Sequence, residues 1–173
     1  GAWVDRTSET LGLIALDIGT SSHLSKKLKP RERVFLMGPM GTPTHIPHHQ
    51  KVLLIGGGLG NAVLFSLAQA MHAEHCQIII VAGYKSKDHV FYAEKIEKFS
   101  HQVIWTYEEG DPIPTHRPQD LSIKGRVTDI WDQDLKFDFD WTQADHLMTV
   151  GSESMMRALQ EKFASRKTLA QYC

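Results

Sequence analysis

Residues 52–62 read Val-Leu-Leu-Ile-Gly-Gly-Gly-Leu-Gly-Asn-Ala, so four apolar residues are followed at once by four glycines in five positions. An unbroken apolar run is typical of a parallel strand that is covered on both faces. The glycines allow a tight turn directly after it, and apolar residues from Ala62 to Met71 then recur at helical spacing. The stretch therefore predicts a strand, a glycine-rich turn and a helix.

The same alternation of strand and helix continues through the rest of the chain. Further strands are expected at residues 78–82, 103–105 and 147–150. Helices are expected at residues 91–99, 125–131 and 155–163, and the polar, aromatic stretch 133–142 is interpreted as an inserted loop. Alternation of this kind predicts an α/β fold with a doubly wound parallel sheet.

The residues before position 50 are organised differently. Short strands are expected at residues 11–18 and 34–37, with a short helical turn between them at residues 21–28. Glycine and proline then recur from residue 38 to residue 47, which indicates turns and irregular chain. A boundary between two structural units is therefore expected near residue 48.

The composition of the 173 residues is that of an ordinary globular protein. The formal net charge is −1, which removes the electrostatic drive for binding nucleic acid. No apolar run approaches the roughly 18 residues that a membrane span needs, and no secretory leader is recognised at the start. Two cysteines, Cys76 and Cys173, are too few for a disulfide framework or a cysteine-bound cluster. We therefore expect a cytoplasmic protein without a nucleic-acid or membrane partner.

The glycine-rich turn has the arrangement that binds a phosphate group. Glycines let the backbone approach a phosphate, whose charge is stabilised by free N–H groups and by the positive end of the helix dipole. The common dinucleotide pattern Gly-x-Gly-x-x-Gly is not met, because Asn61 stands where its third glycine would be. The pattern present is Gly56-x-Gly58-x-Gly60. A tight turn that binds nothing is the alternative interpretation.

Five short motifs, in the same order, resemble the ferredoxin–NADP reductase superfamily. The turn with its strand resembles that family's nicotinamide-nucleotide turn, Gly19-Thr20-Ser21-Ser22 its second flavin motif, and residues 38–41 its Gly-Pro-x-Gly bridge. Residues 125–129 and 150–156 resemble segments of the electron-transfer subunits of dihydroorotate dehydrogenase and of related sulfhydrogenase subunits. Residues 60–64 and 117–120 are similar to FAD/NAD-binding oxidoreductases linked to glutamate synthase.

The resemblance implies a domain arrangement and a set of cofactor-binding residues. Residues 1–47 would be the last strands of an FAD-binding β-barrel, residues 48–165 an NAD(P)-binding domain and residues 166–173 a C-terminal tail. The residues expected to bind the nicotinamide nucleotide are Gly56, Gly57, Gly58, Leu59, Gly60, Asn61, Ala62, Tyr84, Lys85, Glu108, Gly151, Ser152, Glu153 and Met155. Those expected to bind FAD in the intact protein are Gly19, Ser21 and Ser22.

The chain departs from the family at three points. The family's first flavin motif, Arg-x-Tyr-Ser/Thr, does not occur, and Val150 stands where the family often has the cysteine that abuts the nicotinamide. The ferredoxin-type cysteine cluster that follows this domain in the electron-transfer subunits is not found before Cys173. These departures predict a fragment of a larger flavoprotein that is inactive on its own.

Charged residues after the second and third strands bear on the choice of nucleotide. Lys85 and Lys87 could bind the 2′-phosphate of NADPH, whereas Glu108 and Glu109 would repel it and accept hydrogen bonds from ribose hydroxyls. This charge pattern favours NAD(H) over NADP(H). The alternative is that all four charges are solvated loop residues.

The function implied by the resemblance is electron transfer between a nicotinamide nucleotide and FAD, and then to an iron–sulfur or synthase partner subunit. The cofactors carry such chemistry, so no catalytic side chain is assigned. His45, His48 and His49 lie close in sequence, but without a nearby acid or cysteine they make an incomplete metal site, and no metal is expected. The alternative function is a nucleotide-binding or interaction module without turnover.

Overall fold

The computed structural model describes residues 2–38 and 40–164. The expected C-terminal tail at 166–173, Cys173, and Pro39 of the 38–41 motif lie outside the described residues. The strands are β1 (Ala2–Asp5), β2 (Thr10–Leu13), β3 (Lys51–Gly57), β4 (Gln77–Tyr84), β5 (Gln102–Tyr107), β6 (Leu121–Lys124) and β7 (His146–Val150). The α-helices are α1 (Thr20–Ser25), α2 (Asn61–Ala73), α3 (Ala93–Lys98) and α4 (Glu153–Phe163), and short 3₁₀ turns are η1 (Gly58–Gly60), η2 (Lys87–His89), η3 (Ile130–Asp132) and η4 (Trp141–Gln143).

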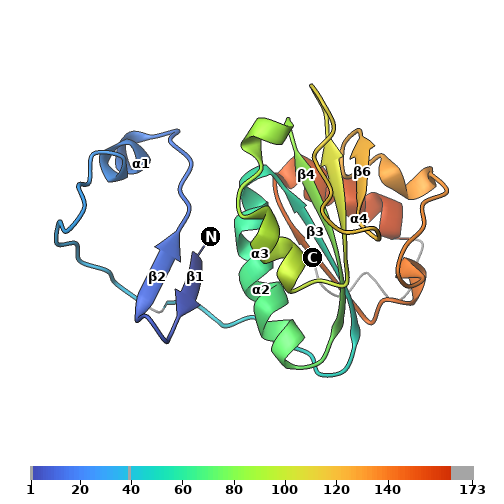
Figure 1. The fold of residues 1–173 in the computed structure, drawn as a ribbon, viewed down its shortest axis with the longest axis horizontal. Coiled ribbons are helices and arrows are strands. Elements are labelled where there is room, and N and C mark those ends of the chain that lie inside the picture. Colours follow the sequence, from blue (N-terminus) through green and yellow to red (C-terminus); the bar gives the residue numbers. More distant parts are fainter. Residues whose placement is uncertain (1, 39, 165–173) are drawn as a thin grey trace.

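The main body is a parallel sheet of five strands in the order β6-β5-β4-β3-β7. Helices α2 and α3 cover one face of this sheet, and α4 lies on the other face (Figure 1). The prediction of an α/β fold with a doubly wound parallel sheet is confirmed.

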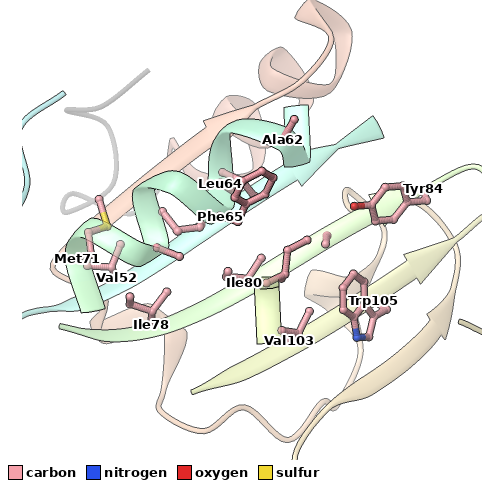
Figure 2. Packing of buried hydrophobic residues seen from close by; sticks show 14 of the residues in the cluster. Val52, Ala62, Leu64, Phe65, Met71, Ile78, Ile80, Tyr84, Val103 and Trp105 are labelled. Carbon is pink, nitrogen blue, oxygen red and sulfur yellow. The ribbon is translucent and has the colours of Figure 1, made fainter. Parts of the chain in front are cut away.

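The apolar run of β3 is buried on both faces. Val52 and Leu54 pack with α2 and the near side of β4 and β5, as Figure 2 shows for Val52, Ile78 and Phe65. Leu53 and Ile55 point to the opposite face and pack with Leu159 and Phe163 of α4, among others. This burial on both faces explains why the run contains no polar residue and why the strand could be predicted from the sequence.

The N-terminal residues form a small unit of their own. Strands β1 and β2 make an antiparallel hairpin in which Trp3 pairs with Gly12. The Trp3 ring contacts Phe65 of α2 and Tyr92, with ring centroids 5.6 and 4.7 Å apart. The hairpin is therefore fastened to the outer side of α2. The assignment of residues 1–47 to a β-barrel stays a prediction.

Two expected N-terminal strands differ from the structure. Residues 34–37 form no strand, and the Phe35 side chain is fully exposed. Four apolar residues without a neighbouring strand have no hydrogen-bonding partner that would hold them extended. The strand expected at residues 11–18 is real only at Thr10–Leu13, where β1 pairs with it.

Two further differences lie after β5. Residues 125–131 were expected to form a helix, but they form a turn at Gly125, which has φ +138°, followed by the 3₁₀ turn η3. Strand β6 was not expected at all. It is a four-residue edge strand in which polar Ser122 and Lys124 alternate with Leu121 and Ile123, so it lacks the apolar run of a central strand.

Candidate functional site

The order of the strands opens a crevice at one end of the sheet. The chain runs outward from β3 through β4, β5 and β6, and then returns to place β7 on the free side of β3. The connections after β3 and β7 therefore leave the sheet toward opposite faces, α2 on one and α4 on the other. In open α/β sheets, ligands bind outside the carboxyl ends of the strands at this point of reversal.

The glycine-rich turn needs its glycines for two different reasons. Gly58 has φ +55°, a left-handed conformation, and a Cβ atom there would meet nothing within 4 Å. Gly60 lies so close to the end of β7 that a Cβ would collide with the carbonyl group of Val150. The turn is thus pressed against β7 at Gly60 and open to solvent at Gly58.

A row of small residues crosses the sheet beside the turn. Gly57 of β3 pairs with Gly83 of β4, and Gly83 pairs with Thr106 of β5. Side chains from outside the sheet cover the two glycines: Met155 lies over Gly57, and Val127 lies over Gly83. A Cβ at either glycine would collide with its covering side chain, so the floor of this region is backbone.

Three predicted residues face the protein interior. The Asn61 side chain is fully buried, and its Nδ2 donates to the Gly83 carbonyl at 2.9 Å, which ties the start of α2 to the end of β4. Ala62 is also fully buried, and a Cβ at Gly56 would collide with Asn61. These residues shape the turn from below, and their side chains do not reach its open side.

A cavity of about 490 Å³ lies over the glycine floor. It extends from the glycine turn across the ends of β4 and β5 to the loop after β6 and the first turn of α4. The predicted site residues that it brings together are Gly57, Gly58, Tyr84, Lys85, Glu108, Ser152 and Met155. Those that do not line it are Gly56, Leu59, Gly60, Asn61, Ala62, Gly151, Glu153, Gly19, Ser21 and Ser22.

The cavity also contains residues to which the sequence analysis assigned no role. They are Gly83, Thr106, Gly125, Arg126, Val127, Thr128, Ser154 and Ala158. The 125–129 motif was a usable signal for four of them. Gly83 and Thr106 could not be found in this way, because their position depends on the pairing of three strands.

Most charges around the cavity are paired with one another. Lys85 lies 3.6 Å from Glu109, and Arg126 lies 3.1 Å from Asp129. The hydrogen bond from Arg126 lowers the pKa of Asp129, and the same bond raises the pKa of Arg126. In the described part of the chain, the carboxylate of Glu108 has no ion-pair partner within 4 Å. It lines the cavity without an ion pair, although Arg126 attracts it: the charge of Glu108 contributes to the raised pKa of Arg126.

The start of α4 closes the cavity beside β7. The Ser152 hydroxyl accepts a hydrogen bond from the Met155 N–H at 3.3 Å, which caps the helix. Capping brings Met155 over Gly57 and also over Gly151, where a Cβ would collide with its thioether. Glu153 points away toward Arg157, with which it forms an exposed ion pair at 2.7 Å.

The residues expected to meet the flavin lie at the short helix α1. The Ser22 hydroxyl accepts from the N–H groups of Ile18 and Gly19, at 3.1 and 3.0 Å, and donates to the Gly19 carbonyl. The hydroxyl therefore bonds only within its own turn among the described residues, and Ser21 is exposed. The role of these residues in flavin binding stays a prediction.

Two of the three clustered histidines, His48 and His49, contact residues at the end of α2 and just after it. His48 lies 2.6 Å from Glu74, and the His49 ring stacks on His75 with centroids 5.3 Å apart. Among the described residues, no group of three or more His, Cys, Asp or Glu side chains has a geometry that could hold a metal ion. In the same part of the chain, no helix is long and apolar enough to cross a membrane.

A glycine-rich turn between strand and helix, at the reversal point of a parallel sheet, defines a nucleotide-binding domain. Comparison with known proteins also indicates a nucleotide-binding domain. Residues 54–161 match the family described as "Oxidoreductase NAD-binding domain", and the chain belongs to that family.

Named relatives extend the comparison. The electron transfer subunit of dihydroorotate dehydrogenase B (NAD(+)) from Bacillus mycoides is 30% identical over 95% of this chain and 58% of its own length. A homologue of that subunit from Thermotoga maritima is 30% identical over 76% of this chain and 44% of its own length. The chain thus spans about half the length of these relatives, 58% of one and 44% of the other.

A solved structure gives the same picture. The NADH-dependent reduced ferredoxin-NADP oxidoreductase, described in connection with flavin-based electron bifurcation, superposes with a TM-score of 0.69 at 26% identity. The match covers 95% of this chain and 55% of that one. The expected resemblance to ferredoxin–NADP reductase-like proteins is confirmed.

Proposed function

We propose that the chain is the nucleotide-binding part of a flavin-dependent NAD(P)H oxidoreductase that transfers electrons between a nicotinamide nucleotide and FAD. The observation that carries this proposal is the 490 Å³ cavity with a glycine floor at the point where the strand order reverses. The names of the relatives, electron transfer subunits and an NADH-dependent oxidoreductase, support it.

The residues present fit a dinucleotide. Gly57 and Gly58 line the cavity and have no side chains of their own. A phosphate can therefore approach their backbone N–H groups closely. Ser152 and Met155 would line the nicotinamide end beside β7, and Lys85 and Glu108 the adenosine end beside β4 and β5. When bound, the nicotinamide supplies or accepts the hydride; the protein positions it and excludes water.

The charges of the cavity support a preference for NADH over NADPH. Lys85 and Arg126 each form an exposed ion pair, with Glu109 and Asp129, so Glu108 is the charge that lines the cavity without an ion pair of its own. A carboxylate accepts hydrogen bonds from the two ribose hydroxyls but repels a 2′-phosphate. The pairing seen in the structure thus favours the nucleotide that the sequence pattern favoured.

FAD and a partner redox protein belong to the proposal for the whole protein. The chain spans 58% and 44% of two relatives that are named as subunits or subunit homologues, so other segments and a partner subunit would complete the electron path. An iron–sulfur or synthase subunit fits that position. We therefore expect the chain by itself to bind nucleotide without catalysing sustained electron transfer.

The experiment is a calorimetric titration with NADH of the unmodified protein and of two glycine variants. Gly58 and Gly41 both have positive φ and open space around the missing Cβ, so an alanine strains the backbone at Gly58 by about 1–2 kcal/mol and at Gly41, whose φ of +93° lies outside the αL region, by at least as much. Only Gly58 lines the cavity. NADH should bind with micromolar to millimolar affinity, Gly58→Ala should weaken it at least tenfold, and Gly41→Ala should not.

Two results would count against the proposal. Equal affinity in the unmodified protein and in Gly58→Ala would remove the glycine turn from the site. Binding of NADH without any reduction of flavin in the full-length protein would favour the alternative of a binding module without turnover.

A further inference from the structure

Thr106 is a buried polar residue in the floor of the cavity. Its residue exposure is 1%, and its Oγ1 atom has no hydrogen-bond partner among the described residues. A buried hydroxyl without a partner costs about 1–3 kcal/mol, and one that lines a cavity can recover this cost by bonding to a ligand there. Thr106 lines the cavity beside Gly83, from which a Cβ would lie 3.0 Å from Oγ1.

The position of Thr106 selects one half of a dinucleotide. This inference rests on the proposed function, in which the pyrophosphate lies at Gly57 and Gly58, at the end of β3, and the nicotinamide extends toward β7. Thr106 lies on the other side, two strands away on β5, which is about 10 Å at the usual strand spacing. Glu108, proposed to accept from the ribose hydroxyls, follows it two residues later. The adenosine half is therefore the part within its reach.

Val127 lies beside this hydroxyl, because a Cβ placed on Gly83 would meet both the Val127 side chain and Oγ1. Oγ1 exposes less than 1 Å² to solvent, and Val127 covers the neighbouring Gly83. Val127 belongs to the turn after β6, which begins at Gly125 with φ +138° and has no regular helix. A ligand atom can bond to Oγ1 only if a neighbouring side chain moves, and Val127 is a neighbour that also lines the cavity.

We propose that the Thr106 hydroxyl hydrogen-bonds the adenosine half of the nucleotide, and that Val127 covers this hydroxyl until the nucleotide moves it aside. Thr106 is thus a positioning residue for the nucleotide that neither the family match nor the sequence pattern assigns. The Thr106 hydroxyl has no hydrogen-bond partner in the free protein and gains one in the complex.

The test replaces Thr106 by valine, which keeps the shape and removes the hydroxyl, and by serine, which keeps the hydroxyl. The ligand is ADP-ribose, which lacks the nicotinamide. Thr106→Val should weaken ADP-ribose binding about 5- to 10-fold, the effect of one hydrogen bond. Its melting temperature should stay equal or rise, because no hydrogen bond of the free protein is lost. Thr106→Ser should bind within about twofold of the unmodified protein, the size of a lost methyl contact.

A matched control removes another unpartnered buried hydroxyl. In the part of the chain that the structure describes, the Oγ atom of Ser122 on β6 also has no partner, but Ser122 pairs with Trp105 and so points to the α2 side of the sheet, outside the cavity. Ser122→Ala should leave the affinity for ADP-ribose unchanged. Unchanged affinity in Thr106→Val, or a lower melting temperature with normal affinity, would overturn the inference and leave the proposed function standing. Failure of the unmodified protein to bind ADP-ribose or NADH would overturn both.

The covering role of Val127 has its own measurement. Val127→Ala removes the atoms that cover Gly83 and should tighten ADP-ribose binding. In the Thr106→Val background this gain should vanish, since a double-mutant cycle reports the coupling of the two residues. A gain that persists without the hydroxyl would show that Val127 acts on the ligand independently of Thr106.

Discussion

His101 makes a hydrogen bond that only the neutral form of its ring can make. The ring Nδ1 of His101 accepts from the backbone N–H of Ile78 at 3.0 Å, and the backbone N–H of His101 donates to the Ile78 carbonyl at 2.8 Å. Partial burial of the ring lowers the pKa of His101, with smaller contributions from His72 and Arg117, against Asp138, which raises it. The residue holds the start of β5 against β4.

This bond predicts a loss of stability in mild acid. Because the folded-state pKa of His101 lies below the unfolded value of about 6.5, its contribution is complete above about pH 6.5 and is lost as pH falls from there through the lower folded-state pKa. Urea denaturation between pH 7.5 and 5 should show a less steep decline for His101→Asn, whose amide oxygen accepts without titrating.

His116 must be separated from this effect. The hydrogen bond that His116 donates to the Glu97 carboxylate raises the pKa of His116, so its contribution is present below about pH 6.5 and is lost as pH rises through the higher folded-state pKa, which is the opposite sign. The comparison is therefore made in a His116→Gln background. Identical pH slopes with and without His101→Asn would refute the prediction.

Glu108 is the residue on which the choice of nucleotide depends. Replacing it by glutamine removes the unpaired charge beside the proposed ribose and keeps the size of the side chain. The ratio of NADPH to NADH affinity should rise about fivefold, which corresponds to about 1 kcal/mol of screened repulsion. Asp111→Asn is the control, because Asp111 pairs with Lys87 at 2.6 Å and neither residue lines the cavity. Tighter binding of NADPH than of NADH by the unmodified protein would contradict the preference itself.

At the scale of elements, the sequence predicted what depends on neighbours along the chain. The strand at residues 52–55, the glycine turn and α2 could be read directly, because burial on both faces and helical spacing leave a local pattern. Strand β6 could not, since its four alternating residues become a strand only when β5 pairs with them. The same holds for the cavity. Its glycine turn could be predicted from the sequence, whereas Gly83 and Thr106 line it only because of the register between β3, β4 and β5.

Arg117 joins three elements that the sequence pattern treated as separate. Its guanidinium donates to both carboxylate oxygens of Asp120, at 2.8 and 2.7 Å, and to the carbonyls of Glu97 and Ser100, at 2.6 and 2.8 Å. The Asp120 side chain is fully buried and also accepts from the N–H of Val103 at the start of β5. The end of α3, the start of β5 and the approach to β6 are thus held by one side chain.

Removing this arginine should destabilise the protein strongly. Arg117→Leu leaves the carboxylate of Asp120 buried without a counter-charge, and breaking a buried pair in this way costs about 3–5 kcal/mol. Arg157→Leu provides the comparison, because its ion pair with Glu153 has the same 2.7 Å distance but both side chains are mostly exposed. That change should cost about 0–1 kcal/mol in the same urea titration. Similar losses for the two variants would show that Asp120 is not a buried, dependent charge.

At the scale of the whole molecule, the hairpin and the sheet meet through few side chains. Trp3 contacts Phe65 and Tyr92, and the Lys95 ammonium lies 3.7 Å from the centre of its ring. Many apolar side chains between residues 11 and 40 remain exposed, whereas the core of the sheet is closed. The hairpin therefore depends on the sheet, and the sheet does not depend on the hairpin.

Trp3→Ala should release the hairpin and leave the sheet intact. Hydrogen exchange of amides in β1 and β2 should accelerate, because an isolated two-stranded hairpin is marginal in water, while β3 to β5 keep their protection. Phe35→Ala is the control, since that ring is fully exposed and should change neither region. Loss of protection in β4 or β5 on Trp3→Ala would mean that the two units fold together.

The return of β7 to the side of β3 has a consequence for the newborn chain on the ribosome. One edge of β3 acquires β4 soon after synthesis, but the other waits for His146–Val150, which is made many residues later. At ordinary synthesis rates this delay is roughly 5–20 s. Throughout it the apolar strand β3 presents an open edge, which is the feature that invites mispairing with other chains. Chaperone dependence should therefore be greatest for molecules truncated just before β7.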